Sequence, residues 1–227
     1  CGFTIARSGP GQPDVGDASP GIASRLRAGT LQIVNSIALR NWQEQRCGAL
    51  DEMEEAHAMV GGTARGRRFA TQQINRGYAV LLASHFQGYC RDLHSESADI
   101  LAHHWLGPNL YLSRLLRAAL TRERKLDRGN AHEGTIANDY NRFGLNLWSL
   151  VDRQDARNVR RREHLRSMNL WRNAISHQDF NAARLGGKTT LRLADVRQWR
   201  SSCNRLATCL DKAMQQHLQQ LTGVAPW

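Results

Sequence analysis

Residues 163–180 read EHLRSMNLWRNAISHQDF, and this stretch decides the fold that the sequence predicts. Neither proline nor glycine interrupts it, so a continuous helix is expected. Apolar side chains recur along it at steps of three and four residues, at Leu165, Met168, Trp171 and Ile175. Because this spacing places them on one face, we expect that face to pack into the core.

The polar residues of the stretch fall on other faces of the same helix. At roughly 100° per residue, Asn173 and His177 lie one turn apart and can share a ligand. Arg172 falls toward the apolar arc, where its guanidinium must reach solvent or meet an anion because it cannot lose its charge. Helical spacing alone favours the plainer interpretation of a surface Asn and His with one Arg that reaches out to solvent.

The hexapeptide RNAISH at residues 172–177, near the end of a late helix, resembles the R-x4-6-H signature of the HEPN superfamily. Residues 78–93, YAVLLASHFQGYCRDL, are similar to a long apolar helix in the RiboL-PSP-HEPN branch, which is linked to RNA processing and defence. The closing TLRLADVRQW and its long helix resemble the last element of that branch. The resemblance covers most of residues 50–223, but Gln87 stands where the branch carries Glu.

The resemblance implies a metal-independent endoribonuclease that leaves a 2′,3′-cyclic phosphate, in a toxin–antitoxin or phage-defence setting. His177 would act as general base on the ribose 2′-hydroxyl or as acid toward the leaving oxygen, since imidazole exchanges protons near neutral pH. Arg172 would neutralise charge on the phosphoryl oxygens, and Asn173 would orient the phosphate or the imidazole. A single His is a thin inventory for an acid and a base together. We therefore expect a homodimer with a composite active site, of the kind that HEPN proteins form.

Charge supports an anionic partner. The 227 residues include 31 Lys and Arg against 20 Asp and Glu, a net charge of +11, and the excess lies after residue 60. Clustered cations gain affinity for phosphates by releasing counterions, so RNA is the expected partner. An antitoxin or a neighbouring defence protein is the second expected partner.

The densest run of cations lies directly upstream of the hexapeptide. The residues predicted to bind RNA are Arg157, Arg160, Arg161, Arg162 and Arg166. A solvated helix face accounts for such a run equally well. Two other functions therefore stay open: a non-catalytic HEPN-like module that binds RNA or a protein through its basic face, and a helical DNA-binding protein, although no helix-turn-helix spacing supports the latter.

Residues 1–21 are rich in Gly, Pro, Asp and Ser without periodicity, and we expect a disordered leader there. Residues 22–227 are expected to form one all-α domain, an antiparallel up-and-down bundle of about five to seven helices. Asp195 is expected to cap the last helix, which ends at Gly223, after a short extended piece at 189–193. Helices are predicted over 22–46, 49–60, 67–105, 109–127, 136–150, 163–180 and 196–221.

Cysteines and histidines predict neither a metal nor a cofactor. The five cysteines match no zinc or disulfide spacing, which favours a reducing cytoplasm. His94, His103 and His104 should point to different helix faces without acidic ligands, so they are expected to be solvated. No apolar run approaches the length of a membrane span, so no membrane partner is predicted.

Overall fold

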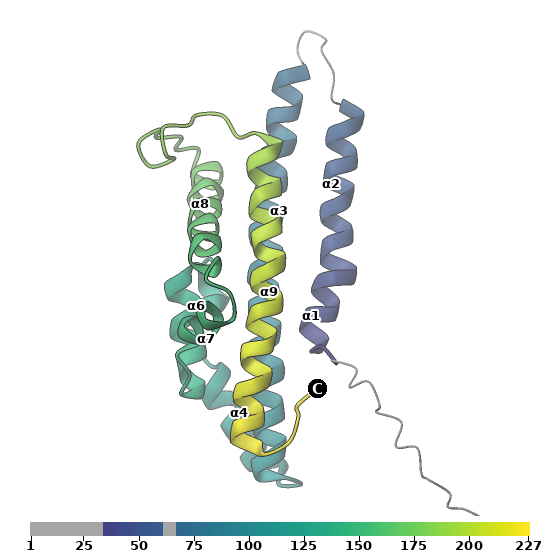
Figure 1. The fold of residues 1–227 in the computed structure, drawn as a ribbon, viewed down its shortest axis with the longest axis vertical. Coiled ribbons are helices and arrows are strands. Elements are labelled where there is room, and N and C mark those ends of the chain that lie inside the picture. The colour runs from purple at the N-terminus through teal and green to yellow at the C-terminus, as the bar shows by residue number, and fades with distance from the viewer. Residues whose placement is uncertain (1–33, 61–66) are drawn as a thin grey trace, which may run out of the picture. The chain divides into compact units, whose positions relative to one another are not determined.

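The helix α3 (Arg67–Leu106) is 40 residues long, and most other helices of this computed structural model pack against it (Figure 1). The structure describes residues 34–60 and 67–227, which belong to the compact unit Val34–Trp227. The apolar stripe predicted for α3 is fully buried at Tyr78, Leu82, Phe86, Tyr89 and Leu93. The predicted leader and the first part of the 22–46 helix lie outside the described residues.

Within the described ranges the chain forms helices and no strand, which confirms the predicted all-α class. The remaining elements are α1 (Ile37–Asn41), the π-helical segment η1 (Trp42–Arg46), α2 (Cys47–Val60), α4 (Leu110–Thr121), α5 (Lys125–Arg128), α6 (Glu133–Tyr140), the 3-10 turn η2 (Asn141–Phe143), α7 (Leu147–Gln154), α8 (Asn158–His177) and α9 (Leu193–Thr222). None of these helices is both long and apolar enough to cross a membrane.

The long helices alternate in direction, as an up-and-down bundle requires. In Figure 1, α2 and α8 run opposite to α3 and α9, and α9 lies alongside α3. Because α8 packs on both α3 and α9, the backbone of the hexapeptide at its C-terminal end is held in a fixed position.

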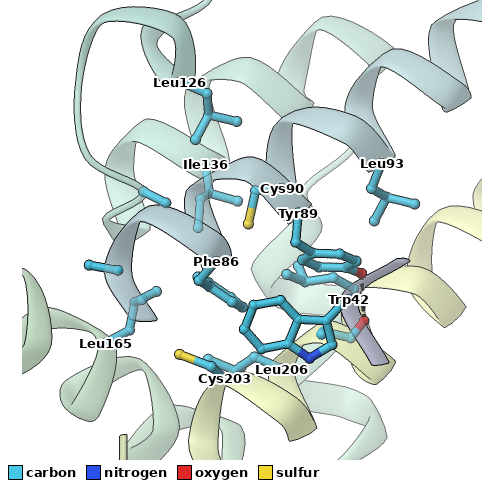
Figure 2. Packing of buried hydrophobic residues seen from close by; sticks show 14 of the residues in the cluster. Trp42, Phe86, Tyr89, Cys90, Leu93, Leu126, Ile136, Leu165, Cys203 and Leu206 are labelled. Carbon is cyan, nitrogen blue, oxygen red and sulfur yellow. Dashed lines mark hydrogen bonds between the residues drawn. The ribbon is translucent and has the colours of Figure 1, made fainter. Parts of the chain in front are cut away.

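Aromatic side chains from η1 and α3 fill the centre of the core (Figure 2). The Trp42 and Phe86 rings meet edge to face with centroids 5.7 Å apart, an arrangement that aromatic pairs prefer. The Tyr89 hydroxyl donates to the Ala207 carbonyl oxygen of α9 at 2.7 Å, so its burial leaves no unpaired donor. Burial raises the pKa of Tyr89 well above its ordinary value.

Two helices are shorter than the sequence predicts. The predicted 109–127 helix ends at Thr121, because Arg122 is extended and Glu123 has a φ of 56°. The predicted 136–150 helix is divided between α6 and α7 at Gly144, whose φ of 73° lies in the left-handed region that glycine tolerates best. Asn146 caps the N-terminus of α7, because its side-chain oxygen accepts a hydrogen bond from Ser149 N at 3.3 Å.

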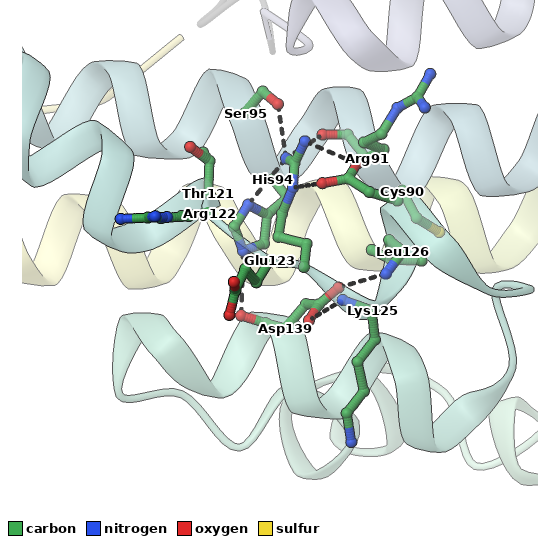
Figure 3. A network of polar contacts seen from close by, with 12 residues as sticks. Cys90, Arg91, His94, Ser95, Thr121, Arg122, Glu123, Lys125, Leu126 and Asp139 are labelled. Atoms are coloured by element: carbon green, nitrogen blue, oxygen red, sulfur yellow. Dashed lines mark hydrogen bonds and ion pairs between the residues drawn. The ribbon is translucent and has the colours of Figure 1, made fainter.

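His94 corrects a prediction, because it is buried and not solvated. Its Nε2 donates to the Asp139 carbonyl oxygen at 3.1 Å, which leaves Nδ1 to accept from Arg124 Nη1 at 3.4 Å (Figure 3). Burial lowers the pKa of His94 to about 4, so the ring is neutral at physiological pH. Its role is to hold α3, α6 and the segment after α4 together.

The start of α9 also differs from the prediction. The helix begins at Leu193, where an extended piece was expected, and Asp195 lies inside its first turn. An Asp195 carboxylate oxygen accepts from Arg192 N at 3.1 Å, so this side chain still satisfies a backbone donor at the helix start. The predicted end at Gly223 is confirmed, with a φ of 78°.

Candidate active site

The C-terminal end of α8 is held on the bundle by aromatic packing. Trp171 is buried on the inner face of α8, as predicted. The centroid of its ring lies 6.5 Å from the centroid of the Phe180 ring, just beyond the helix. The Arg76 guanidinium of α3 lies over Phe180 at 4.1 Å from the ring centroid. Gln178, with a φ of 55°, ends the helix. These contacts fix the position of His177, the last residue of α8.

Asn173 and His177 share a cavity, as their spacing predicts. Both are exposed, and they line a space of about 470 Å³ together with Asp179 and Arg184 from the loop after α8. The His177 ring forms no hydrogen bond or ion pair with any residue in the described ranges. Its ring nitrogens are therefore available to form a hydrogen bond with a bound molecule.

The Asn173 amide is fixed by two donors. Its Oδ1 accepts from Asn130 Nδ2 at 2.6 Å and from Arg172 Nη1 at 3.3 Å. Because the oxygen is occupied, the amide presents its NH₂ group, a donor suited to a phosphate oxygen.

Arg172 does not line the cavity that His177 lines. The two residues are five apart in α8, which places them roughly 140° apart around the helix axis. Arg172 instead reaches sideways to Asn173, as its contact with Oδ1 shows. The structure therefore brings Asn173 and His177 together in one cavity and leaves Arg172 on the adjacent arc.

Sequence reasoning missed Asp179 and Arg184 as cavity residues. Their side chains form an exposed ion pair at 3.2 Å. The loop returns to the bundle because Leu185 is buried, and this carries Arg184 back to His177. The only signal in the sequence was the pair of leucines, Leu185 and Leu191, within residues 183–191, ARLGGKTTL, which otherwise has the composition of a flexible connection.

Two members of the predicted RNA-binding run hold the protein together. Arg162 pairs with Glu133 and with Asp152, and its guanidinium lies 5.3 Å from the Trp148 ring centroid. Arg161 pairs with Asp155 at 2.9 Å. Their side chains are only 16% and 12% exposed, so both are largely unavailable to a ligand.

The other members of that run face solvent. Arg157 pairs with Asp155, yet its side chain is 80% exposed. Arg166 is also exposed and makes a long contact of 3.5 Å with Glu133. Arg160 is exposed and has neither a hydrogen bond nor an ion pair within residues 34–60 and 67–227. These three cations remain accessible from solvent.

Gln87, which departs from the expected Glu, has a structural contact. Its Nε2 donates to the Leu126 carbonyl oxygen at 2.7 Å and so ties α5 to α3. A carboxylate could not make this contact, because it has no proton to donate.

Comparison with protein families supports the resemblance. A family model described as RiboL-PSP-HEPN matches residues 52–216, a span that includes both the Gln87 helix and the hexapeptide. Searches of curated proteins and of solved structures found no match to this chain. Since the family model covers more than half of its length, the chain belongs to the RiboL-PSP-HEPN family.

Proposed function

We propose that this protein is an endoribonuclease that cuts RNA without a metal ion, through attack of a ribose 2′-hydroxyl on the adjacent phosphate. The observation that supports it most is the unbonded imidazole of His177 in a cavity with the Asn173 amide and the Arg184 guanidinium. Such a set supplies a proton acceptor, a phosphate ligand and a cation in one place.

The proposed reaction has two proton transfers. Neutral imidazole takes the 2′-hydroxyl proton while O2′ bonds to phosphorus, and the bond from phosphorus to the 5′-oxygen breaks. An imidazolium then gives a proton to that leaving oxygen. The products are a 2′,3′-cyclic phosphate and a 5′-hydroxyl end, and DNA is not cut because it lacks the attacking group.

Two copies of the chain would complete the site. One cavity holds one His177, and Arg172 of the same chain lies on a different arc of α8. A two-fold axis beside α8 would add a second imidazole and would let Arg172 of one copy meet the phosphate held by the other.

RNA binding in this proposal uses the exposed cations Arg157, Arg160 and Arg166, whereas Arg161 and Arg162 support the fold. An uncontrolled ribonuclease would harm its own cell, so we place the protein in a toxin–antitoxin or phage-defence setting with a protein that restrains it.

The test is cleavage of a mixed RNA in EDTA by the wild type and by His177→Ala. We expect the substitution to slow cleavage by about 10²- to 10⁴-fold, the contribution of a general acid or base, while RNA affinity is retained. His104→Ala, an exposed histidine near the end of α3, is the matched control and should cut like the wild type. Equal cleavage by the wild type and His177→Ala would contradict the proposal.

One observation favours a second candidate, a non-catalytic module that binds RNA or a partner protein. Arg172 is directed to Asn173 and not into the His177 cavity, an arrangement that serves structure as well as catalysis. RNA binding without cleavage by any form of the protein would support this candidate.

A further inference from the structure

A second cavity lies directly beside the first along α8. It encloses about 550 Å³ between α6, α7 and α8 and shares Leu170 and Asn173 with the His177 cavity. The two cavities therefore form neighbouring compartments on one face of the helix. The α8 residues that line them, Arg166, Leu170, Asn173 and His177, recur at steps of four, three and four.

Part of the wall of this second cavity is apolar and suits an aromatic ring, and polar side chains complete its lining, namely those of His132, Glu133, Arg166, Asn169 and Asn173. Ala137 of α6 and Leu170 of α8 line it together with the Trp148 indole of α7. The indole is fixed because its Nε1 donates to the Glu133 carbonyl oxygen at 3.0 Å. Apolar and aromatic walls of this kind hold unstacked bases of single-stranded RNA.

Asn169 supplies one free acceptor in this apolar setting. The residue is only 6% exposed and lines the cavity. Both hydrogens of its amide are used, since Nδ2 donates to the Ala131 carbonyl oxygen at 3.1 Å and to the Leu165 carbonyl oxygen at 2.9 Å. Its Oδ1 accepts no hydrogen bond from the described residues. This oxygen is not one of the fully buried atoms without a partner, so it is open to a donor from a molecule in the cavity.

The charges around the cavity allow a polyanion to approach. The Glu133 carboxylate at its edge is paired with Arg162 and lies 3.5 Å from Arg166. Its negative charge is thus more than balanced. The Arg166 guanidinium, which is largely exposed, remains at the rim to contact a phosphate.

We propose that this cavity is a nucleobase subsite, which takes the base of a nucleotide next to the one cleaved at His177. The proposal rests on the proposed function, in that it assigns the scissile phosphate to the His177 cavity. Asn169 and His177 are eight residues apart, roughly 12 Å along the helix axis, so the two cavities serve different nucleotides. Asn169 Oδ1 accepts from an N–H on the base edge. All four bases carry such a donor but at different positions, so the fixed place of Oδ1 in the cavity decides which base is held best.

Binding of RNA to the His177→Ala form of the full chain tests the subsite without cleavage. Four trinucleotides, each made of a single base, are titrated while the Trp148 indole N–H signal is followed by NMR. We expect one trinucleotide to bind about tenfold more tightly than the weakest, the effect of one well-placed hydrogen bond. Ala137→Leu on the same background fills the cavity and should abolish this difference. Asn138→Leu, one residue along α6 and outside the cavity, should preserve it.

Equal affinity for all four trinucleotides, or a difference that survives Ala137→Leu, would overturn the subsite. Cleavage of a longer RNA by the wild type is measured in parallel. Cleavage without base discrimination would refute the subsite alone, whereas base discrimination without cleavage would refute the ribonuclease and leave the subsite in place.

Discussion

His177 ends α8 with a free imidazole, whereas Arg172, five residues earlier, is already engaged with Asn173. The sequence allowed us to predict which residues share a face of the helix, because helical geometry fixes that relation. It did not allow us to predict Arg184, since the return of a loop depends on the burial of Leu185 and not on any periodic pattern.

Substitution of Arg172 should affect the chemical step. We expect Arg172→Ala to lower kcat by about 10²- to 10³-fold with a smaller change in RNA affinity, because the guanidinium acts on charge that develops in the transition state. Arg172→Lys should recover little, since an ammonium group cannot make the planar, two-pronged contact. Single-turnover kinetics separate the two effects, and full recovery by lysine would contradict the assignment.

Replacement of Asp211 by Asn should increase the stability of the protein in a pH-dependent way. This carboxylate of α9 is buried, and burial raises its pKa from 3.8 to about 6. The folded state therefore binds more protons between these pH values, so the stability of the wild type falls as pH rises through them, by about 3 kcal/mol from this group. Asp211→Asn does not titrate and can still accept from the Ser36 hydroxyl.

We expect Asp211→Asn to raise the free energy of unfolding by about 2 kcal/mol at pH 8, with the gain disappearing near pH 4. Urea unfolding of both proteins at the two pH values measures this. A variant that is less stable than the wild type at pH 8 would show that the ionised carboxylate has a stabilising partner.

At the scale of elements, the long helices were predictable and the breaks were not. The stripe on α3 and the inner face of α8 follow from apolar spacing alone. The end of α4 depends on tertiary contacts, chiefly those of Arg124, which is buried next to the turn at Glu123, whereas α6 and α7 are divided at Gly144. The guanidinium donates to Ser95 Oγ at 2.8 Å and pairs with Asp127, which no sequence pattern indicates.

Removal of Arg124 should loosen this junction. Arg124→Ala leaves the Arg91 carbonyl and His94 Nδ1 without their donor, so we expect a loss of about 2–3 kcal/mol in the free energy of unfolding. Arg117→Ala breaks an exposed ion pair with Asp99 and should cost less than about 1 kcal/mol. Equal losses for the two variants in thermal or urea unfolding would contradict a structural role for the buried network.

At the scale of the whole molecule, the proposed active site requires two copies of the chain. We expect a particle of twice the 25.6 kDa chain mass in light scattering. If His177 of one copy acts with Arg172 of the other, and one imidazole serves both proton transfers in turn, co-folding the inactive His177→Ala and Arg172→Ala forms should restore about a quarter of wild-type activity. About half of the dimers would be mixed, and each of these would hold one intact site of two. Absence of restoration would show either that both residues of a site lie in one chain or that the site needs both imidazoles.

Cleavage in EDTA of an RNA of defined sequence, compared with the same RNA carrying a single 2′-deoxy nucleotide at the mapped cut, is the sharpest test of the proposed chemistry. Attack by the 2′-hydroxyl predicts a 2′,3′-cyclic phosphate and a 5′-hydroxyl end on the first substrate and an uncut bond in the second. Cleavage at the deoxy position, or ends with a 5′-phosphate, would contradict the chemistry assigned to His177.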